Sequence, residues 1–238
     1  MFPIKDTIPS KRFPVVNFTI IGLNILVFFF EVSLNEDELN NLIIGLGVVP
    51  VRYTELLITS QWDIGALWLL IPLLSNMFLH GGLAHIIGNM WSLWIFGDNV
   101  EDRMGRWNYL CFYLLCGLLA SITHILSDPT STVPAIGASG AISGVMGSYM
   151  FLYPHSQIIF FVPILFIWFI QLPAFIYLGF WFFTQFMSGT SSLGSSMSGG
   201  IAFWAHIGGF VAGAILFRFF LWEKKRKMYA DEYYRNYL

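Results

Sequence analysis

A serine between small residues forms the first motif that could do chemistry, Gly137-Ala138-Ser139-Gly140. A serine hydroxyl is a weak nucleophile until a neighbouring base takes its proton. The glycines let the backbone turn tightly and let another chain come close. Alone, the motif is a weak signal, because Gly140 and Gly144 also form a GxxxG pair that suits helix packing.

His206 offers the base that such a serine needs, in the run AHIGG at 205–209. His206, Gly209 and Gly213 follow the spacing i, i+3 and i+7, so a helix would present an imidazole above a glycine groove. Small residues on two helices let the backbones approach, which could bring a serine oxygen within about 3 Å of an imidazole nitrogen. The alternative is a histidine bonded to a neighbouring serine or carbonyl for structure alone.

His85 and Asn89 form a third candidate, in the run HIIGN at 85–89. Their i, i+4 spacing places both side chains on one face of a helix. Both side chains can donate hydrogen bonds, as stabilisation of an oxyanion requires. A buried polar pair that links helices is the competing interpretation.

The other histidines indicate no further chemistry. His80 is interpreted as interfacial, and His124 and His155 are assigned to helix ends. The chain has 5 histidines but no HExxH motif and no Cys/His cluster, so we expect neither a metal nor another cofactor.

Apolar segments must position these side chains. The chain is 56% hydrophobic and 11% charged, whereas soluble domains contain about 25% charged residues, so a water-soluble protein is excluded. Crossing a hydrocarbon core about 30 Å thick takes a helix of roughly 20 apolar residues. We predict about six such segments, at about 14–32, 83–100, 107–126, 139–153, 158–187 and 200–222.

The segments between these spans differ in character. Residues 33–82 mix acidic and apolar residues, which predicts a structured loop partly in the membrane interface. The Ser/Gly-rich stretch 188–199 predicts a mobile loop. The first apolar run has no small-residue cleavage site after it, which favours a retained helix over a signal peptide. Cys111 and Cys116 fall on different faces of one helix, so no disulfide is expected between them.

Cations predict the orientation in the membrane. Six crossings put both termini on one side, together with every lysine and arginine except Arg52. We therefore expect a cytoplasmic N-terminal segment (1–13), a six-helix domain (14–222) and a basic cytoplasmic tail (223–238). No organelle-targeting arm is apparent, which favours a prokaryotic plasma membrane.

The three motifs then share one depth. Ser139 starts the fourth segment from the outer side, His206 lies a few residues into the sixth, and His85 and Asn89 lie early in the second. The predicted outer half of the bundle has no Asp or Glu, although Asp128 in a short outer loop stays open as a third member. A Ser-His dyad is therefore expected rather than a triad.

Four motifs in this order resemble the rhomboid family of intramembrane serine proteases. GASG at 137–140 matches directly, AHIGG with Gly213 is similar to the family's AHxxGxxxG, and HIIGN is similar to HxxxN. EDRMG at 101–105, preceded by Gly97, is similar to the ExRxG element. The resemblance covers the chain from the first apolar segment to the sixth. At Ser143 some relatives carry an aromatic residue that packs on the histidine ring.

The resemblance implies an all-α membrane protein, a six-helix bundle with a long first loop, that works as a serine endopeptidase. Ser139 would attack a peptide carbonyl, and His206 would relay the proton. The backbone N–H of Ser139, with His85 and Asn89, would form the oxyanion hole.

Two further residues receive a structural role from the resemblance. Glu101 and Arg103 would tie the second helix to neighbouring loops near the cytoplasmic face.

The expected partners are the lipid bilayer and single-pass or polytopic membrane proteins, which the resemblance implies are cut near the outer end of a helix. No nucleic-acid partner is expected. We expect the fifth segment, with Pro163 and Pro173, to move and admit substrate from lipid, and 188–199 to act as a lid.

Two alternatives remain. A non-catalytic relative that binds membrane proteins for quality control is disfavoured because both Ser139 and His206 are present. A transporter or channel would place polar residues at many depths, whereas here they gather near one face.

Overall fold

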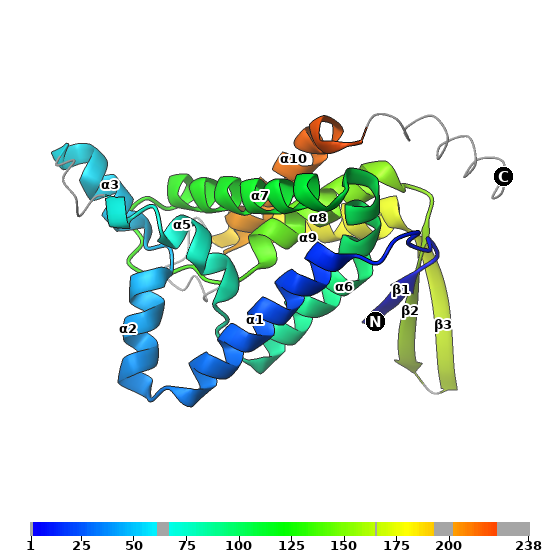
Figure 1. Cartoon of the computed structure of the whole chain (residues 1–238), viewed down its shortest axis with the longest axis horizontal. Coiled ribbons are helices and arrows are strands. Elements are labelled where there is room, and N and C mark those ends of the chain that lie inside the picture. Colours follow the sequence, from blue (N-terminus) through cyan, green and yellow to red (C-terminus); the bar gives the residue numbers. More distant parts are fainter. Residues whose placement is uncertain (1, 61–66, 165, 193–201, 223–238) are drawn as a thin grey trace.

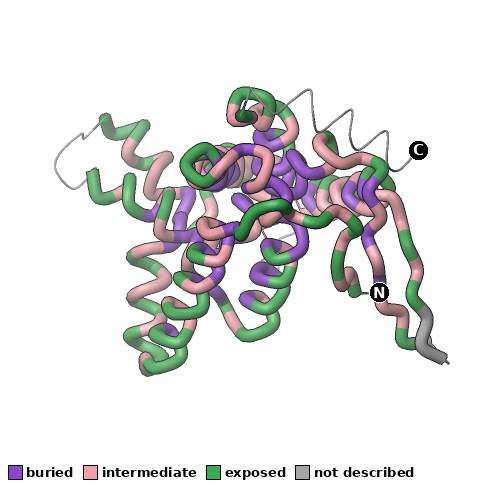
Figure 2. The backbone as a smooth tube through the Cα atoms, turned by 45° about the vertical axis from the view of Figure 1, so that its right-hand side comes forward, coloured by how far each residue is buried: buried purple, intermediate pink, exposed green. Residues whose placement is uncertain are grey.

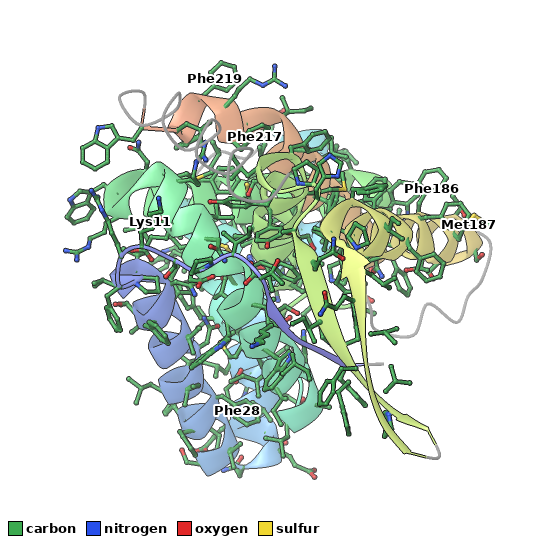
Figure 3. The ribbon with its side chains drawn as sticks, turned by 90° about the vertical axis from the view of Figure 1, so that its right-hand side faces the viewer. Lys11, Phe28, Phe186, Met187, Phe217 and Phe219 are labelled. Atoms are coloured by element: carbon green, nitrogen blue, oxygen red, sulfur yellow. The ribbon has the colours of Figure 1, made fainter. Side chains whose placement is uncertain are left out.

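The computed structural model describes residues 2–60, 67–164, 166–192 and 202–222, and most of them are helical (Figure 1). Among the described residues, three helices are long and apolar enough to cross a membrane: α1 (Val15–Ser33), α7 (Arg106–Ser127) and α10 (Phe203–Phe220). Exposed apolar side chains such as Phe186 and Phe219 project from the helices (Figure 3). Such surfaces suit contact with lipid rather than with water.

A second set of helices completes the bundle: α6 (Leu83–Met104), α8 (Ser139–Leu152) and α9 (Ala174–Ser192). The helix α8 lies at the centre, with α7, α6 and α10 packed around it. Every residue from Gly140 to Tyr149 is buried. Buried residues accordingly gather where these helices meet (Figure 2).

The described residues between α1 and α6 are structured, as predicted. It forms α2 (Glu36–Leu46), α3 (Pro50–Thr59), the short α5 (Pro72–Ser75) and the 3-10 helix η1 (Asn76–Phe78). A capping box starts α2: the Asn35 side chain accepts from the Glu38 N–H at 2.9 Å, and the Glu38 carboxylate accepts from the Asn35 N–H at 3.2 Å. The sheet and this segment lie at opposite ends of the molecule (Figure 1).

The prediction of one helix over about 158–187 is wrong, and the description of the fold as all-α fails in the same place. Residues Gln157–Ile164 form β2 and Phe166–Pro173 form β3, an antiparallel hairpin, and α9 begins only at Ala174. The N-terminal strand β1 (Phe2–Asp6) pairs with β2, giving a three-stranded sheet of order β1-β2-β3.

Composition explains the hairpin. The run is rich in β-branched and aromatic residues, which favour a pleated strand over a helix. Strand β1 pairs with β2 only over Ile158–Phe161. Pro163 lies beyond this pairing, so β1 does not need the N–H group that a proline lacks. Pro173 ends β3 directly before α9, where a proline is well tolerated.

Glutamates hold both ends of α1. The carboxylate of Glu101 on α6 accepts hydrogen bonds from the backbone N–H groups of Val16 at 3.2 Å and Asn17 at 2.7 Å. These are among the N–H groups that the first turn of a helix leaves without a partner. At the other end, the Glu31 carboxylate accepts from the His80 N–H at 3.1 and 3.2 Å.

The two cysteines and the predicted loop and tail can be compared with their expected positions. Cys111 is exposed and Cys116 is buried, and both are free thiols on different faces of α7. Of the predicted loop 188–199, the first five residues belong to the end of α9; 193–199 lie outside the described residues. The predicted tail 223–238 also lies outside them.

Candidate active site

Ser139 begins α8 after a glycine turn. Gly137 has a φ of +124°, a conformation that side chains disfavour, and its N–H donates to the Asn76 carbonyl at 2.8 Å. A Cβ at Gly137 would lie 2.7 Å from the Cε1 and Nε2 atoms of His85 and 3.6 Å from Ser139 Oγ. Only glycine therefore fits here, and both His85 and the serine hydroxyl lie against it.

Ser139 and His206 form a hydrogen bond of 2.8 Å between Oγ and Nε2. They are 67 residues apart in sequence, on α8 and α10. Glycines make this approach possible: a Cβ at Gly209 would lie 2.0 Å from the Gly140 carbonyl oxygen, and one at Gly213 would lie 1.9 Å from the Gly144 carbonyl oxygen. The two backbones are in direct contact just below the serine and the histidine.

The other nitrogen of the His206 ring has a partner that the sequence did not suggest. Nδ1 lies 2.8 Å from Oε1 of Gln185 on α9. An amide oxygen only accepts, which assigns the hydrogen to Nδ1 and leaves the Nε2 lone pair for the Ser139 hydroxyl. The available signal was a glutamine in the aromatic run FWFFTQF, whose amide lacks the charge by which an Asp or Glu marks a third member.

The residue beside the imidazole also comes from α9. The ring centroids of Trp181 and His206 lie 6.0 Å apart with an interplanar angle of 36°. Ser143, where some relatives carry an aromatic residue, instead donates from its hydroxyl to the Ser139 carbonyl at 2.6 Å. The aromatic neighbour of His206 is thus supplied by a different helix.

His85 lies near the serine, but neither His85 nor Asn89 bonds to it. The His85 Nδ1 accepts from the Gly81 N–H at 3.4 Å. The Asn89 amide nitrogen lies 3.0 Å from Nε2 of His80. His85 therefore flanks Gly137 and the serine, while the Asn89 side chain contacts His80.

His80, interpreted as interfacial, is buried inside the protein. The residue is buried, 3% exposed, and its ring lies edge-on to His85 with centroids 5.1 Å apart. Burial, with a smaller contribution from His85, lowers the pKa of His80 to about 4, so its imidazole is neutral at pH 7. Neutral Nε2 can then accept from the Asn89 amide.

The two other histidines lie where helix ends were predicted. His124 is in the last turn of α7, and His155 follows the end of α8. Arg103, expected to be structural, places its guanidinium 5.9 Å from the ring centroid of Tyr153, near the end of α6.

A small cavity borders Ser139. Its volume is about 20 Å³, enough for one water, and its lining includes Ser139, Asn76, Ser121 and His124. The Asn76 amide donates to the Ser121 hydroxyl at 3.2 Å, so polar groups already line one wall. Ser139 and His206 thus lie beside a space that can hold a water.

The Rhomboid domain model matches residues 67–223, a range that contains Ser139, His206, His85 and Asn89. The chain is 31% identical over 140 residues to Rhomboid protease GluP of Bacillus subtilis, covering 58% of this chain and 25% of that protein. It is 31% identical over 96 residues to Rhomboid protein 1, mitochondrial, of Saccharomyces cerevisiae, covering 39% and 28%. It is 28% identical over 145 residues to Putative rhomboid protease YdcA of Bacillus subtilis, covering 60% and 64%.

The chain thus spans only about a quarter of the length of the first two relatives, which are bacterial and mitochondrial proteins. The family match and the apolar helices identify an integral membrane protein. Because the family model covers well over half of the sequence, this chain belongs to the rhomboid family.

Proposed function

We propose that the chain is an intramembrane serine endopeptidase with Ser139 as nucleophile and His206 as general base. One observation carries the proposal: the 2.8 Å contact between Oγ and Nε2, made by residues of two helices whose glycines let them meet. This is the distance at which a base takes the proton of an attacking hydroxyl.

The reaction follows from these positions. As Oγ attacks the peptide carbonyl, its proton passes to Nε2 of His206, which then gives it to the leaving amine. The acyl-enzyme is released by a water that the same imidazole activates. A cavity beside Ser139 with room for one water is consistent with this step.

The second requirement is stabilisation of the negative charge on the oxygen of the tetrahedral intermediate. Ser139 is the first residue of α8, so its backbone N–H lacks an intrahelical partner and the helix dipole favours negative charge there. His85 flanks the serine across Gly137. Asn89 has two amide hydrogens, of which the bond to His80 uses one. Together these groups make up the proposed oxyanion hole.

The fold we propose has six crossings: α1, α6, α7, α8, α9 and α10. The 14 residues of α8 rise about 21 Å, less than a hydrocarbon core of about 30 Å, so Ser139 would lie within the membrane thickness. The cation distribution would place both termini in the cytoplasm. A prokaryotic plasma membrane stays a prediction, as does the division at 13 and 222.

Substrates in this proposal are membrane proteins that enter sideways from lipid. The helix α9 faces outward with exposed Phe180, Phe183 and Phe186, and it leads from the hairpin rather than from a continuous helix. We propose that α9 yields to let the substrate reach Ser139.

Cleavage of a single-span model substrate in liposomes tests the proposal, with Ser139→Ala and His206→Ala beside the wild type. Ser143→Ala is the matched control, because its hydroxyl lies one turn further on α8 and bonds only a backbone carbonyl. We expect both site variants to lose at least about 10³-fold in rate while remaining folded, and the control to keep its rate. Binding without cleavage by the wild type would support the non-catalytic alternative instead.

A further inference from the structure

His206 contacts a different helix through each of its ring nitrogens. Nε2 faces Ser139 on α8, and Nδ1 faces Gln185 on α9 at 2.8 Å. A neutral imidazole has one donor and one acceptor, so a partner that fixes the donor also fixes the acceptor. Gln185 therefore selects the tautomer in which Nε2 can take a proton.

Gln185 differs in this from the other polar residues near the end of α9. The hydroxyls of Thr184, Thr190 and Ser191 all donate to carbonyls of α9 itself. Such bonds satisfy the side chain within the helix and bind nothing outside it. Gln185 instead reaches across to α10.

The face of α9 that carries Gln185 is directed at α10. Trp181, Gln185 and Gly189 recur every fourth residue and so share one face. Trp181 lies beside the His206 ring, and a Cβ at Gly189 would lie 3.3 Å from Ile207. The contact between Gln185 and His206 therefore depends on α9 being packed against α10.

We infer that Gln185 is a positioning residue of the site, forming a Ser139–His206–Gln185 relay that couples the packing of α9 to activation of the serine. The inference rests on the proposed function. With α9 packed, His206 is held with Nε2 toward Ser139. With α9 displaced, the ring loses its only fixed partner on the Nδ1 side, and the serine is less reactive until α9 returns.

Removing the amide should weaken activation without unfolding the protein. An Nδ1–H left unpaired in an apolar site destabilises the productive ring orientation, and we expect Gln185→Leu to lower kcat roughly 10- to 100-fold with little change in KM. Leucine is apolar and similar in size, so it suits a helix surrounded by aromatic residues. Thr184→Val is the matched control, since its hydroxyl bonds only Trp181 of the same helix.

Gln185→Glu supplies a readout that a purely structural role would not move. A carboxylate also accepts the Nδ1–H, so this variant should keep kcat within a few-fold of the wild type. Its negative charge favours the imidazolium, so the acidic limb of the pH–kcat profile should move to higher pH by about one unit or more.

The experiment measures labelling of Ser139 by a small fluorophosphonate, cleavage of the model substrate, and the ¹⁵N shifts of His206 in the full chain. We expect slow labelling of Gln185→Leu, and a ring with hydrogen on Nδ1 in the wild type but a mixture of tautomers in Gln185→Leu. Wild-type rates and shifts in Gln185→Leu, or an unmoved pH profile in Gln185→Glu, would overturn the inference. Absence of labelling in the wild type would instead reject the proposed function, and the shifts would still test the contact.

Discussion

The helix α10 meets its two neighbours in different ways. Toward α8 the contact is backbone on backbone: Gly209 faces the Gly140 carbonyl, and Gly213 faces the Gly144 carbonyl, with no room for a methyl group at either. Toward α9 the contact is made by side chains, chiefly aromatic rings such as Phe182 against Phe210 with centroids 4.8 Å apart. One face is fixed by geometry, and the other can rearrange.

The division suits the proposed function, which requires that Ser139 and His206 stay together while a substrate is admitted. A backbone contact has no rotamers, so the spacing between the two backbones that carry Ser139 and His206 changes only if whole helices move. Aromatic side chains can change rotamer and repack while the helix that carries them shifts. Ser139 and His206 thus lie on the rigid face, and Gln185 lies on the adaptable one.

The largest expected effect comes from adding one methyl to the rigid face. Gly213→Ala would bring a Cβ to 1.9 Å from the Gly144 carbonyl oxygen, so α8 and α10 must separate. We expect a loss of about 3 kcal/mol or more in stability, together with loss of Ser139 labelling. Thermal unfolding in detergent and fluorophosphonate labelling measure the two effects.

The matched control lies on the adaptable helix. A Cβ at Gly179 of α9 would meet nothing within 4 Å. Gly179→Ala should therefore leave labelling intact and raise stability by about 0.5–1 kcal/mol, because alanine favours a helix. Equal losses of stability and labelling in the two alanine variants would contradict the difference between the two faces of α10.

A smaller and opposite effect is expected on the aromatic face. Phe182→Ala removes the ring that packs on Phe210, which should loosen α9 without separating α8 from α10. We expect cleavage of a membrane substrate to rise about two- to five-fold if release of α9 limits the rate, with a stability loss of about 1–3 kcal/mol.

Labelling by a small probe separates entry from chemistry in this variant. The probe does not need α9 to open fully, so its rate should rise less than that of substrate cleavage. A fall in both rates, as in Gly213→Ala, would show that the aromatic face also holds the dyad together.

The sequence predicts the rigid face better than the adaptable one. Short spacings along single helices identify Ser139, His206 and the glycines near them as candidates. The pair that the structure joins could therefore be predicted from the sequence. The secondary structure of 157–173 could not be predicted, because an apolar stretch without clear periodicity fits a helix or a strand. Its pairing with β1 also depends on residues some 150 positions away. Gln185 was missed for a different reason, because its approach to His206 depends on how α9 packs against α10, which spacing along one helix does not reveal.

A polar cluster holds the N-terminal end of α9, here called its foot. The Asp6 carboxylate of β1 accepts hydrogen bonds from the Tyr149 hydroxyl of α8 and, at 2.8 Å, from the Asn99 amide of α6. The Tyr149 hydroxyl also lies 3.0 Å from the Ser156 hydroxyl, and the Ser156 carbonyl accepts from the N–H of Ala174, the first residue of α9. The sheet that contains β1 is thereby joined to the start of the adaptable helix.

Asp6 makes this attachment sensitive to pH. Burial raises the pKa of its carboxyl to about 7, and the nearby Asp98 adds to the rise. A carboxyl whose pKa is raised by folding binds its proton more tightly in the folded state, so its contribution to stability is greatest at low pH and declines as the pH rises through about 7. The foot of α9 should therefore loosen between pH 5 and pH 8.

The smallest predicted effect is the loss of this dependence in Asp6→Asn. The amide oxygen keeps an acceptor for Tyr149 but carries no charge, so the melting temperature should fall several degrees less between about pH 5 and pH 8 than in the wild type. Asp37→Asn, at an exposed position of α2, is the control and should change with pH as the wild type does. If Asp6→Asn keeps the wild-type slope, ionisation of Asp6 does not loosen the attachment of α9. The freedom of that helix must then come from its aromatic face alone.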